Sequence, residues 1–352
     1  MRNFARQLIS MIAFIGCAGP AAAGTLIPVV PFPDSSGTTA YDINDKNEIA
    51  GFYVADNGFY HAFFGTLDGQ YTSFDGENYQ GFAKAIGINN DGWITGYYLN
   101  GDICPPAGQC EFVRKPDGTF VTLSKHGTPL SGLVGQISSK ARFVGSYYDL
   151  DRHNHSFVGQ KTKYKKDLRS DMPSPRARGI NSHGTIVGYS PGTDHDSGFV
   201  LQHGVSTLVD YPDDTASNTY LYKINKSGIA VGYWDTGAPD YIVHGFSYDT
   251  KTSTFYPLDV PGALLYTYLQ GINAAGFIAV QSDAGDFIYC PHKPAKCPGG
   301  GMAVSFGPGI HVPAQKLARH HPGHGVRHRT ATGANSPTAD RVDYFLPLNL
   351  SR

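Results

Sequence analysis

The segment GINSHGTIVGY, residues 179–189, is the most complete copy of a motif that recurs along this 352-residue chain. Its Ile-Asn pair returns at intervals of 45, 49, 43, 44 and 48 residues, once in the degenerate form Ile-Ser. The pairs are Ile43-Asn44, Ile88-Asn89, Ile137-Ser138, Ile180-Asn181, Ile224-Asn225 and Ile272-Asn273. Phenylalanine opens a later block of every copy, at Phe63, Phe112, Phe157, Phe199, Phe246 and Phe287. Self-similarity at such a period is the signature of a repeat architecture.

Each Ile-Asn pair leads into a turn with a simple physical explanation. Asn at the first position of a turn accepts a backbone hydrogen bond, and the residue three positions later needs positive φ. Glycine, which adopts positive φ without a Cβ clash, stands there as Gly92, Gly184, Gly228 and Gly276, and Asn47 stands there in the first copy. The third copy has Ser138 and Ala141 instead, so we expect its turn to be distorted. We interpret the repeated Asn residues as turn formers and the repeated Phe residues as core.

A glycine seven residues after the Asn or Ser in five copies, with aromatics often following, and two further β-like blocks complete the repeat. Four short antiparallel strands form one propeller blade, and a single blade cannot bury both faces, so copies must stack and close. The sequence therefore predicts an all-β fold, a six-bladed β-propeller over residues 24–310. Residues 25–40 resemble the end of a repeat, which predicts that an N-terminal strand closes the last blade. The competing strand for that position is 302–306.

Two short signatures give the repeat a resemblance to a known family. The tripeptide His61-Ala62-Phe63, its near copy His244-Gly245-Phe246 and the segment 179–189 resemble the HAF-type extracellular repeat family. The resemblance covers roughly residues 25–300. It implies an exported bacterial repeat protein with no well-defined activity. Members of that family carry no agreed catalytic residues, so no catalytic residue is assigned to this chain.

The two ends differ from the repeats. Residues 1–23 resemble a signal peptide, with Arg2 and Arg6, a short apolar run and three alanines before a predicted mature start at Gly24. A lipoprotein cleavage at Cys17 is the alternative. No later segment is apolar enough for a transmembrane anchor, so we expect a periplasmic or secreted protein. Residues 311–352 are rich in His and Arg and are typical of a disordered tail, with weak metal or anionic-surface contact as the alternative. Residues 342–350 are apolar enough to form a docked strand.

Cysteines and charge narrow the class further. Cys104 and Cys110 flank a short segment, as do Cys290 and Cys297, and an even count in an exported protein predicts two local disulfides. Free buried thiols, or a metal site that uses all four, are the alternatives. The acids outnumber Lys and Arg in the predicted propeller, which argues against a nucleic-acid partner. The oligomeric state is not indicated.

Acidic residues cluster after the second strand of the repeats, in loops that share one face of a propeller. These acids are Asp56, Asp102, Asp149, Asp151, Asp194, Asp196, Asp235 and Asp283. The same face is expected to hold Tyr79, Tyr211, Tyr220 and Tyr266, although some of these tyrosines could lie in strands or pack between blades. Tyrosine and aspartate suit carbohydrate recognition, so we predict a polar ligand near the central opening, bound by those tyrosines with Asp194 and Asp196. Calcium is a possible cofactor, with Asp149 and Asp151 as the candidate ligands.

No nucleophile elbow, phosphate-binding loop or zinc-protease motif is present in the sequence. The first hypothesis is therefore an exported, non-enzymatic binding or envelope-associated module whose partner is a carbohydrate or another envelope component. The alternative is an enzyme acting on polysaccharide or lactone, with a metal near the central channel. A third hypothesis is a structural or assembly role that uses the C-terminal tail.

Overall fold

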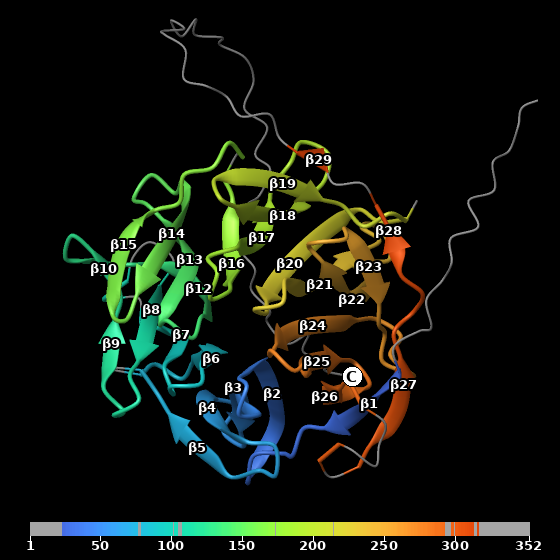
Figure 1. Ribbon diagram of the computed structural model, residues 1–352. Coiled ribbons are helices and arrows are strands. Elements are labelled where there is room, and N and C mark those ends of the chain that lie inside the picture. The colour runs from blue at the N-terminus through green and yellow to red at the C-terminus, as the bar shows by residue number, and fades with distance from the viewer. Residues whose placement is uncertain are drawn as a thin grey trace, which may run out of the picture. The chain divides into compact units, whose positions relative to one another are not determined.

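The computed structural model describes residues 23–312, except 77–78, 101, 105–107, 173, 214, 293–296 and 299, and the backbone of 315–316. In this part of the chain every regular element is a β-strand, and six sheets of four or five strands surround one axis (Figure 1). The prediction of an all-β, six-bladed propeller is confirmed. Among the described residues, no helix is long and apolar enough to cross a membrane.

The first three blades each contain four consecutive antiparallel strands, with the first strand nearest the axis (Figure 1). Blade 1 contains β2 (Ser35–Ile43), β3 (Glu48–Ala55), β4 (Tyr60–Thr66) and β5 (Tyr71–Phe74). Blade 2 contains β6 (Ala83–Ile88), β7 (Ile94–Leu99), β8 (Gln109–Arg114) and β9 (Phe120–Thr122). Blade 3 contains β12 (Gly132–Ile137), β13 (Arg142–Tyr148), β14 (Asn154–Gln160) and β15 (Lys163–Asp167). A small hairpin, β10 (Ser124–Lys125) and β11 (Thr128–Pro129), connects blades 2 and 3.

The last three blades each gain an additional outer strand from the C-terminal segment. Blade 4 contains β16 (Arg176–Ile180), β17 (Ile186–Ser190), β18 (Ser197–Gln202), β19 (Val205–Val209) and β29 (Gln315–Lys316). Blade 5 contains β20 (Asn218–Ile224), β21 (Ile229–Asp235), β22 (Val243–Asp249), β23 (Thr254–Pro257) and β28 (Ile310–His311). Blade 6 contains β24 (Thr267–Ile272), β25 (Ile278–Ser282), β26 (Gly285–Cys290), β1 (Ala23–Pro28) and β27 (Met302–Ser305).

The N-terminal strand closes the ring, as predicted. Strand β1 pairs with β26, from Thr25 opposite Cys290 to Pro28 opposite Phe287. The competing segment, β27, pairs with the other edge of β1 and so becomes a fifth strand. Strands β28 and β29 then cover the outer edges of blades 5 and 4, which leaves fewer unpaired edge groups there. Paired strands thus continue beyond residue 310, where we placed the end of the propeller. The predicted signal, apart from Ala23, and the predicted docked strand lie outside the described residues, as does the predicted tail from residue 317 onward. The described part of that tail pairs in β28 and β29, so the prediction of disorder from residue 311 starts too early.

Every innermost strand carries a β-bulge just before the Ile of its repeat. The pairing with the second strand shifts between Ala40 and Asp42 in blade 1, and at the corresponding place in the other five blades. A bulge redirects side chains, and here it lies beside the axis. The bulge also explains the recurring glycine of the second strand. A Cβ atom on Gly51 would lie 1.8 Å from the carbonyl oxygen of Thr39, so no side chain fits at this position.

In all six turns, the residue three positions after the Asn or Ser has the expected left-handed conformation. Its φ is 61° at Asn47, 50° at Ala141 and between 78° and 92° at the four glycines. The expectation that the third turn is distorted is wrong. The amide of Ser138 donates to the carbonyl of Arg142 at 2.7 Å, and Ala141 donates to the carbonyl of Ser138 at 2.9 Å, the same bonds that Asn44 and its turn make. Ala141 adopts the left-handed conformation despite its side chain, so the backbone of the third turn is the same as in the other copies.

The turn asparagines also tie neighbouring blades together. Each Oδ1 accepts two amides of its own turn, as at Asn225, where the amides of Ser227 and Ile229 donate at 3.0 Å. Each Nδ2 donates to the carbonyl of the next copy's Asn or Ser, at 2.9–3.1 Å. The donors are Asn44, Asn89, Asn181, Asn225 and Asn273, and the bond from Asn273 to Asn44 closes the circle. The interpretation of Asn as a turn former is therefore correct, and the same side chain also joins neighbouring blades.

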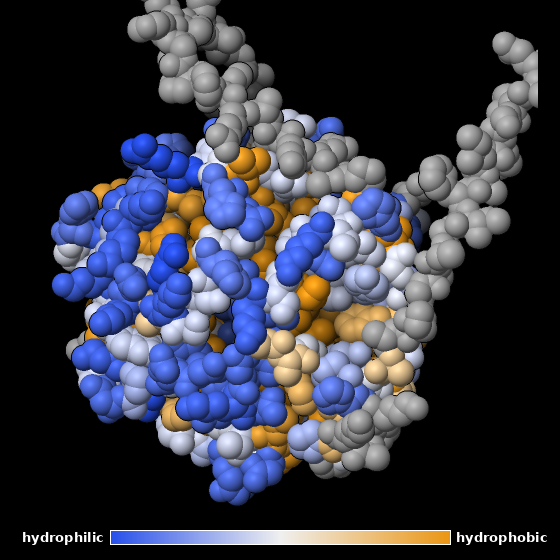
Figure 2. All heavy atoms as spheres, in the orientation of Figure 1, coloured by the Kyte–Doolittle hydropathy of each residue, from blue (hydrophilic) through white to orange (hydrophobic). Residues whose placement is uncertain are grey.

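The repeated phenylalanines form the core between the blades, as predicted. Five of them are fully buried, and Phe287 is partly exposed. Phe246, for example, packs in one cluster with Val187 of blade 4 and Leu221 of blade 5. Complete burial of such a side chain contributes about 1.5–3 kcal/mol. On the face drawn in Figure 2, polar residues cover most of blades 1 to 3, and apolar residues reach the surface mainly among blades 4 to 6.

Candidate functional site

The central axis is closed by polar side chains at the end that carries the asparagine turns. Lys223 Nζ lies 3.7 Å from Asp42 Oδ2 and donates to the carbonyl of Ile86 at 2.6 Å. Gln136 Oε1 accepts the amides of Ile180 and Ile224 at 3.1 and 3.0 Å. Burial raises the pKa of Asp42 and lowers that of Lys223, and their attraction opposes both shifts. A pocket of about 90 Å³ remains among the turns, so this end of the axis is a cross-link between blades rather than a channel.

Two further ionisable groups lie buried in blade 2. Lys84 is 2% exposed, with Nζ 4.0 Å from the ring centre of Phe52, and desolvation lowers its pKa to about 7. Glu111 is fully buried, neither of its carboxyl oxygens has a hydrogen-bond partner among the described residues, and burial raises its pKa well above the usual value. The register places both opposite Tyr97, so they occupy one row across the sheet.

Two of the predicted ligand-binding tyrosines are held by packing instead. Tyr211 is 8% exposed and stacks on Trp234 with 4.9 Å between ring centres. The hydroxyl of Tyr79 donates to the carbonyl of Tyr60 at 2.7 Å, and its ring stacks on His61. These contacts agree with the alternative that some of these tyrosines pack between blades, and ligand binding by Tyr79 and Tyr211 stays a prediction.

The structure brings Tyr220 and Asp196 together. The Tyr220 hydroxyl donates to Asp196 Oδ2 at 3.2 Å, and burial, followed by the Asp196 charge, raises the pKa of Tyr220. The Tyr220 ring contacts Tyr189 and Tyr233, with 4.8 and 4.7 Å between ring centres. Asp194 is exposed on the same loop.

Tyr266 lines a pocket of about 460 Å³ between blades 6 and 1. The wall consists of the β25–β26 turn, the segment between β1 and β2, and the first half of β2. The pocket therefore opens on the face opposite the asparagine turns. Its lining residues are Val29, Pro31, Ser35, Ser36, Gly37, Thr38, Thr39, Tyr266, Gln281, Ser282, Asp283, Gly285 and Asp286. Of the predicted ligand-binding residues, this pocket contains Tyr266. Its hydroxyls, amide and carboxyls suit a polar ligand.

The two acids of this pocket have different roles. Asp283 is a positioning residue, because its carboxylate accepts the amides of Leu264, Leu265 and Tyr266 at 2.9–3.2 Å and fixes the loop that carries Tyr266. Asp286 is largely desolvated, which raises its pKa to about 6, although hydrogen bonds from the Thr39 hydroxyl and the Ser282 amide oppose the shift. Among the residues that the structure describes, no cation contributes to its electrostatic surroundings.

Sequence reasoning missed Asp286 and Glu111, although the repeat contains a signal for both. The residue before the repeated Phe is small in four copies, namely Ala62, Ser156, Gly198 and Gly245. In blades 2 and 6 the same position holds Glu111 and Asp286. A buried acid in place of a small residue costs stability, so such a departure marks a position for attention.

The predicted calcium ligands lie on the β13–β14 loop of blade 3. Donor atoms of Asp149, Asp151 and His153 lie within 4.8 Å of one another, and His155 Nε2 is 2.8 Å from Asp149 Oδ2. The histidine nitrogen makes this set less suited to calcium, which prefers oxygen ligands. Among the described residues, only this group brings three metal-ligand side chains together, and it includes no residue of the axial cross-link. The metal near the central channel in the enzyme hypothesis therefore gains no support from these residues.

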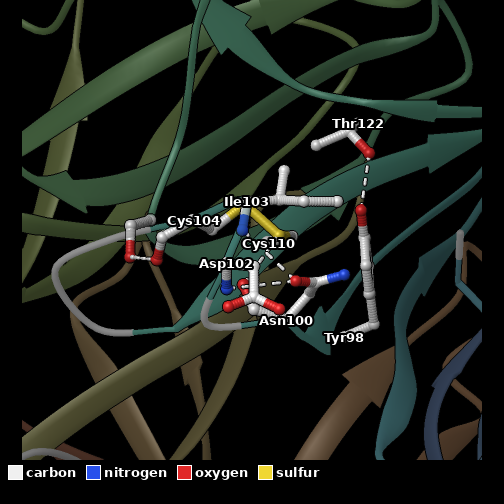
Figure 3. The surroundings of a disulfide bond; sticks show 8 residues. Tyr98, Asn100, Asp102, Ile103, Cys104, Cys110 and Thr122 are labelled. Atoms are coloured by element: carbon white, nitrogen blue, oxygen red, sulfur yellow. Dashed lines mark hydrogen bonds between the residues drawn. A yellow bond between two sulfur atoms is a disulfide. The ribbon is translucent and has the colours of Figure 1, made fainter. Parts of the chain in front are cut away.

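Both predicted disulfides are present, between Cys104 and Cys110 and between Cys290 and Cys297. Around the first, Asn100 Oδ1 accepts the amides of Asp102 and Ile103 at 3.2 Å, which fixes the start of the enclosed loop (Figure 3). Disulfides are typical of oxidising compartments, in agreement with export.

Comparison with known proteins assigns this chain neither a family nor a ligand. No family model and no curated protein matches the chain. Among solved structures, the fucose-recognising lectin of Aleuria aurantia, described as a six-bladed β-propeller, has a TM-score of 0.43 and 13% identity over 79% of this chain and 97% of the lectin. AofleA from Arthrobotrys oligospora has a TM-score of 0.44 and 11% identity over 84% and 91%. The WD40 propeller domain of Doa1 has a TM-score of 0.40 and 14% identity over 77% and 98%. Similarity this low assigns no ligand.

Proposed function

We propose that this protein is an exported, non-enzymatic carbohydrate-binding propeller whose ligand occupies the pocket between blades 6 and 1. The observation that carries the proposal is the pocket itself, about 460 Å³ with Tyr266 beside hydroxyl, amide and carboxyl groups. Ligand sites commonly have volumes of about 300–1,000 Å³ and a few convergent polar groups. The resemblance to HAF-type repeats and the two disulfides support export, and association with the envelope is part of the same proposal.

The chemistry of the pocket fits a sugar. The Tyr266 ring offers a flat apolar surface against which the C–H face of a pyranose can stack. Gln281 offers both a donor and an acceptor, and Ser35, Ser36 and Thr38 offer hydroxyls that can play either role. Because Asp283 holds the backbone that carries Tyr266, the ring is positioned before a ligand arrives, which reduces the entropy lost on binding.

A glycan array followed by calorimetry tests the proposal. Tyr266→Ala is expected to weaken the binding of any captured glycan about tenfold, the value of one aromatic contact. Tyr241→Ala is the matched control, because Tyr241 is 44% exposed on the β21–β22 loop and lies outside the pocket. Equal affinities for the wild type and both variants, each with an unchanged melting temperature, would place the site elsewhere.

A further inference from the structure

The described residues that line the pocket between blades 6 and 1 carry two negative charges and no positive one. Asp283 and Asp286 line it, and none of its lining residues is Lys, Arg or His. The carboxylate of Asp283 is occupied by three backbone amides of the 264–266 loop. Asp286 has a hydroxyl and one amide as partners and no cation. An acidic sugar would bring a third negative charge into this space, so the lining selects against uronic acids.

Asp286 places a half-buried carboxyl group at a position where most other blades have a small, uncharged residue. Four of the other five blades have Ala, Ser or Gly at its position in the repeat. Desolvation of the carboxylate raises its pKa, so at neutral pH the folded protein holds a charge that is poorly compensated. Tyr41 and Tyr266 both lie within electrostatic range of Asp286. A carboxylate with tyrosines nearby suits an ammonium group, which can donate a charge-assisted hydrogen bond to it.

We infer that the pocket binds a sugar that carries a protonated amine, with the ammonium group beside Asp286 and the ring of the sugar against Tyr266. This inference rests on the proposed function and specifies its ligand class. The ammonium donates a charge-assisted hydrogen bond to Asp286 and replaces the missing cation. An N-acetylated sugar lacks that charge and gains only the stacking and hydroxyl contacts.

Four probes distinguish the inference: glucosamine, glucose, N-acetylglucosamine and glucuronate, titrated into the mature protein at pH 7.5. Glucosamine is expected to bind about tenfold or more tightly than glucose, as one hydrogen bond between charged groups implies, and glucuronate is expected to bind weakest. Asp286→Asn keeps the shape of the side chain and is expected to make glucosamine and glucose equal. Asp240→Asn removes an exposed acid on another loop and is expected to keep the preference.

Lower pH gives a second readout. The preference for glucosamine is expected to shrink between about pH 6.5 and pH 5 in the wild type, because Asp286 becomes protonated while the sugar amine, with a pKa of about 7.7 like an α-amino group, stays protonated, and to be flat in Asp286→Asn. Among the described residues, the groups near this carboxyl are Thr39, Tyr41, Tyr266 and the Ser282 amide, Asp283 lines the same pocket, and none of them becomes positively charged.

The outcomes separate the two proposals. Equal affinity for glucose and glucosamine, lost in Tyr266→Ala, would overturn the amine inference and leave the carbohydrate function intact. A glucosamine preference that survives Asp286→Asn would also overturn the inference. Absence of binding of all four sugars, together with a blank glycan array, would overturn both.

Discussion

Ser138 interrupts the ring of asparagine amides, and Ser138→Asn is expected to complete it. Elsewhere in the ring, Asn Nδ2 donates to the carbonyl of the next copy at 2.9–3.1 Å. Ser138 has the same backbone turn, is 5% exposed and borders the pocket of about 90 Å³ together with Asn181, so the longer side chain has room to reach the Asn181 carbonyl. One buried hydrogen bond adds about 0.5–1.5 kcal/mol net. The free energy of unfolding should rise by about 1 kcal/mol.

Denaturant unfolding and thermal melts measure the effect, and the melting temperature should rise by about 2 °C. Ser227→Asn makes the same chemical change at an exposed position of the blade 5 turn and should leave stability within about 0.5 kcal/mol of the wild type. The reverse change, Asn225→Ser, removes a bond to Asn273 and weakens its own turn, so it should cost about 1–3 kcal/mol. A Ser138→Asn variant that is no more stable than the Ser227→Asn control would refute the view that the amides join the blades.

Three other changes follow from the same structure. Replacing Cys104 and Cys110 by Ala should cost about 2.5 kcal/mol, as the short loop implies, and intact mass after alkylation without reductant should show no free thiol in the wild type. Because the pKa of Asp286 is raised to about 6 in the fold, its contribution to stability falls as pH rises from about 4 to 6. Asp286→Asn should therefore stabilise the protein by on the order of 1–3 kcal/mol at pH 7.5 and by little at pH 4, measured by urea unfolding. Lys223→Met should cost about 3–5 kcal/mol because it leaves Asp42 buried without its cation, and pairing it with Asp42→Asn should recover much of the loss in a double-mutant cycle.

The sequence predicts the architecture because the chain contains six copies of one repeat, which can be compared with one another. A residue that recurs in every copy, such as the Phe at position 246, and one that recurs in most, such as the turn glycine, report the shared scaffold without any alignment of homologues. The closing strand was also predictable, because residues 25–40 resemble the end of a repeat that has no beginning. The added edge strands were not predictable, because β28 and β29 are two residues long and pair through the backbone, which leaves little pattern in the side chains.

The candidate site was predicted less well, for a physical reason. The bulge in each innermost strand breaks the alternation of side chains, so position alone does not say whether Tyr220 faces a loop, a neighbour or the axis. Tyr211 looked similar to Tyr266 in sequence, yet one is core and the other lines a pocket. Asp286 was detectable only as a departure from the repeat.

Alternate blades differ at the axis, and steric contact explains the pattern. The residue before each Ile of the repeat is, in order, Asp42, Gly87, Gln136, Gly179, Lys223 and Gly271. A Cβ atom on Gly271 would lie 2.6 Å from the Cα of Asp42, and one on Gly179 would lie 2.9 Å from the Cα of Lys223. At each of these two positions, the absence of a side chain on glycine leaves room for the polar residue of the following blade. Odd blades also carry the stacked histidines His61, His155 and His244, so the ring repeats chemically every two blades although its backbone repeats every blade.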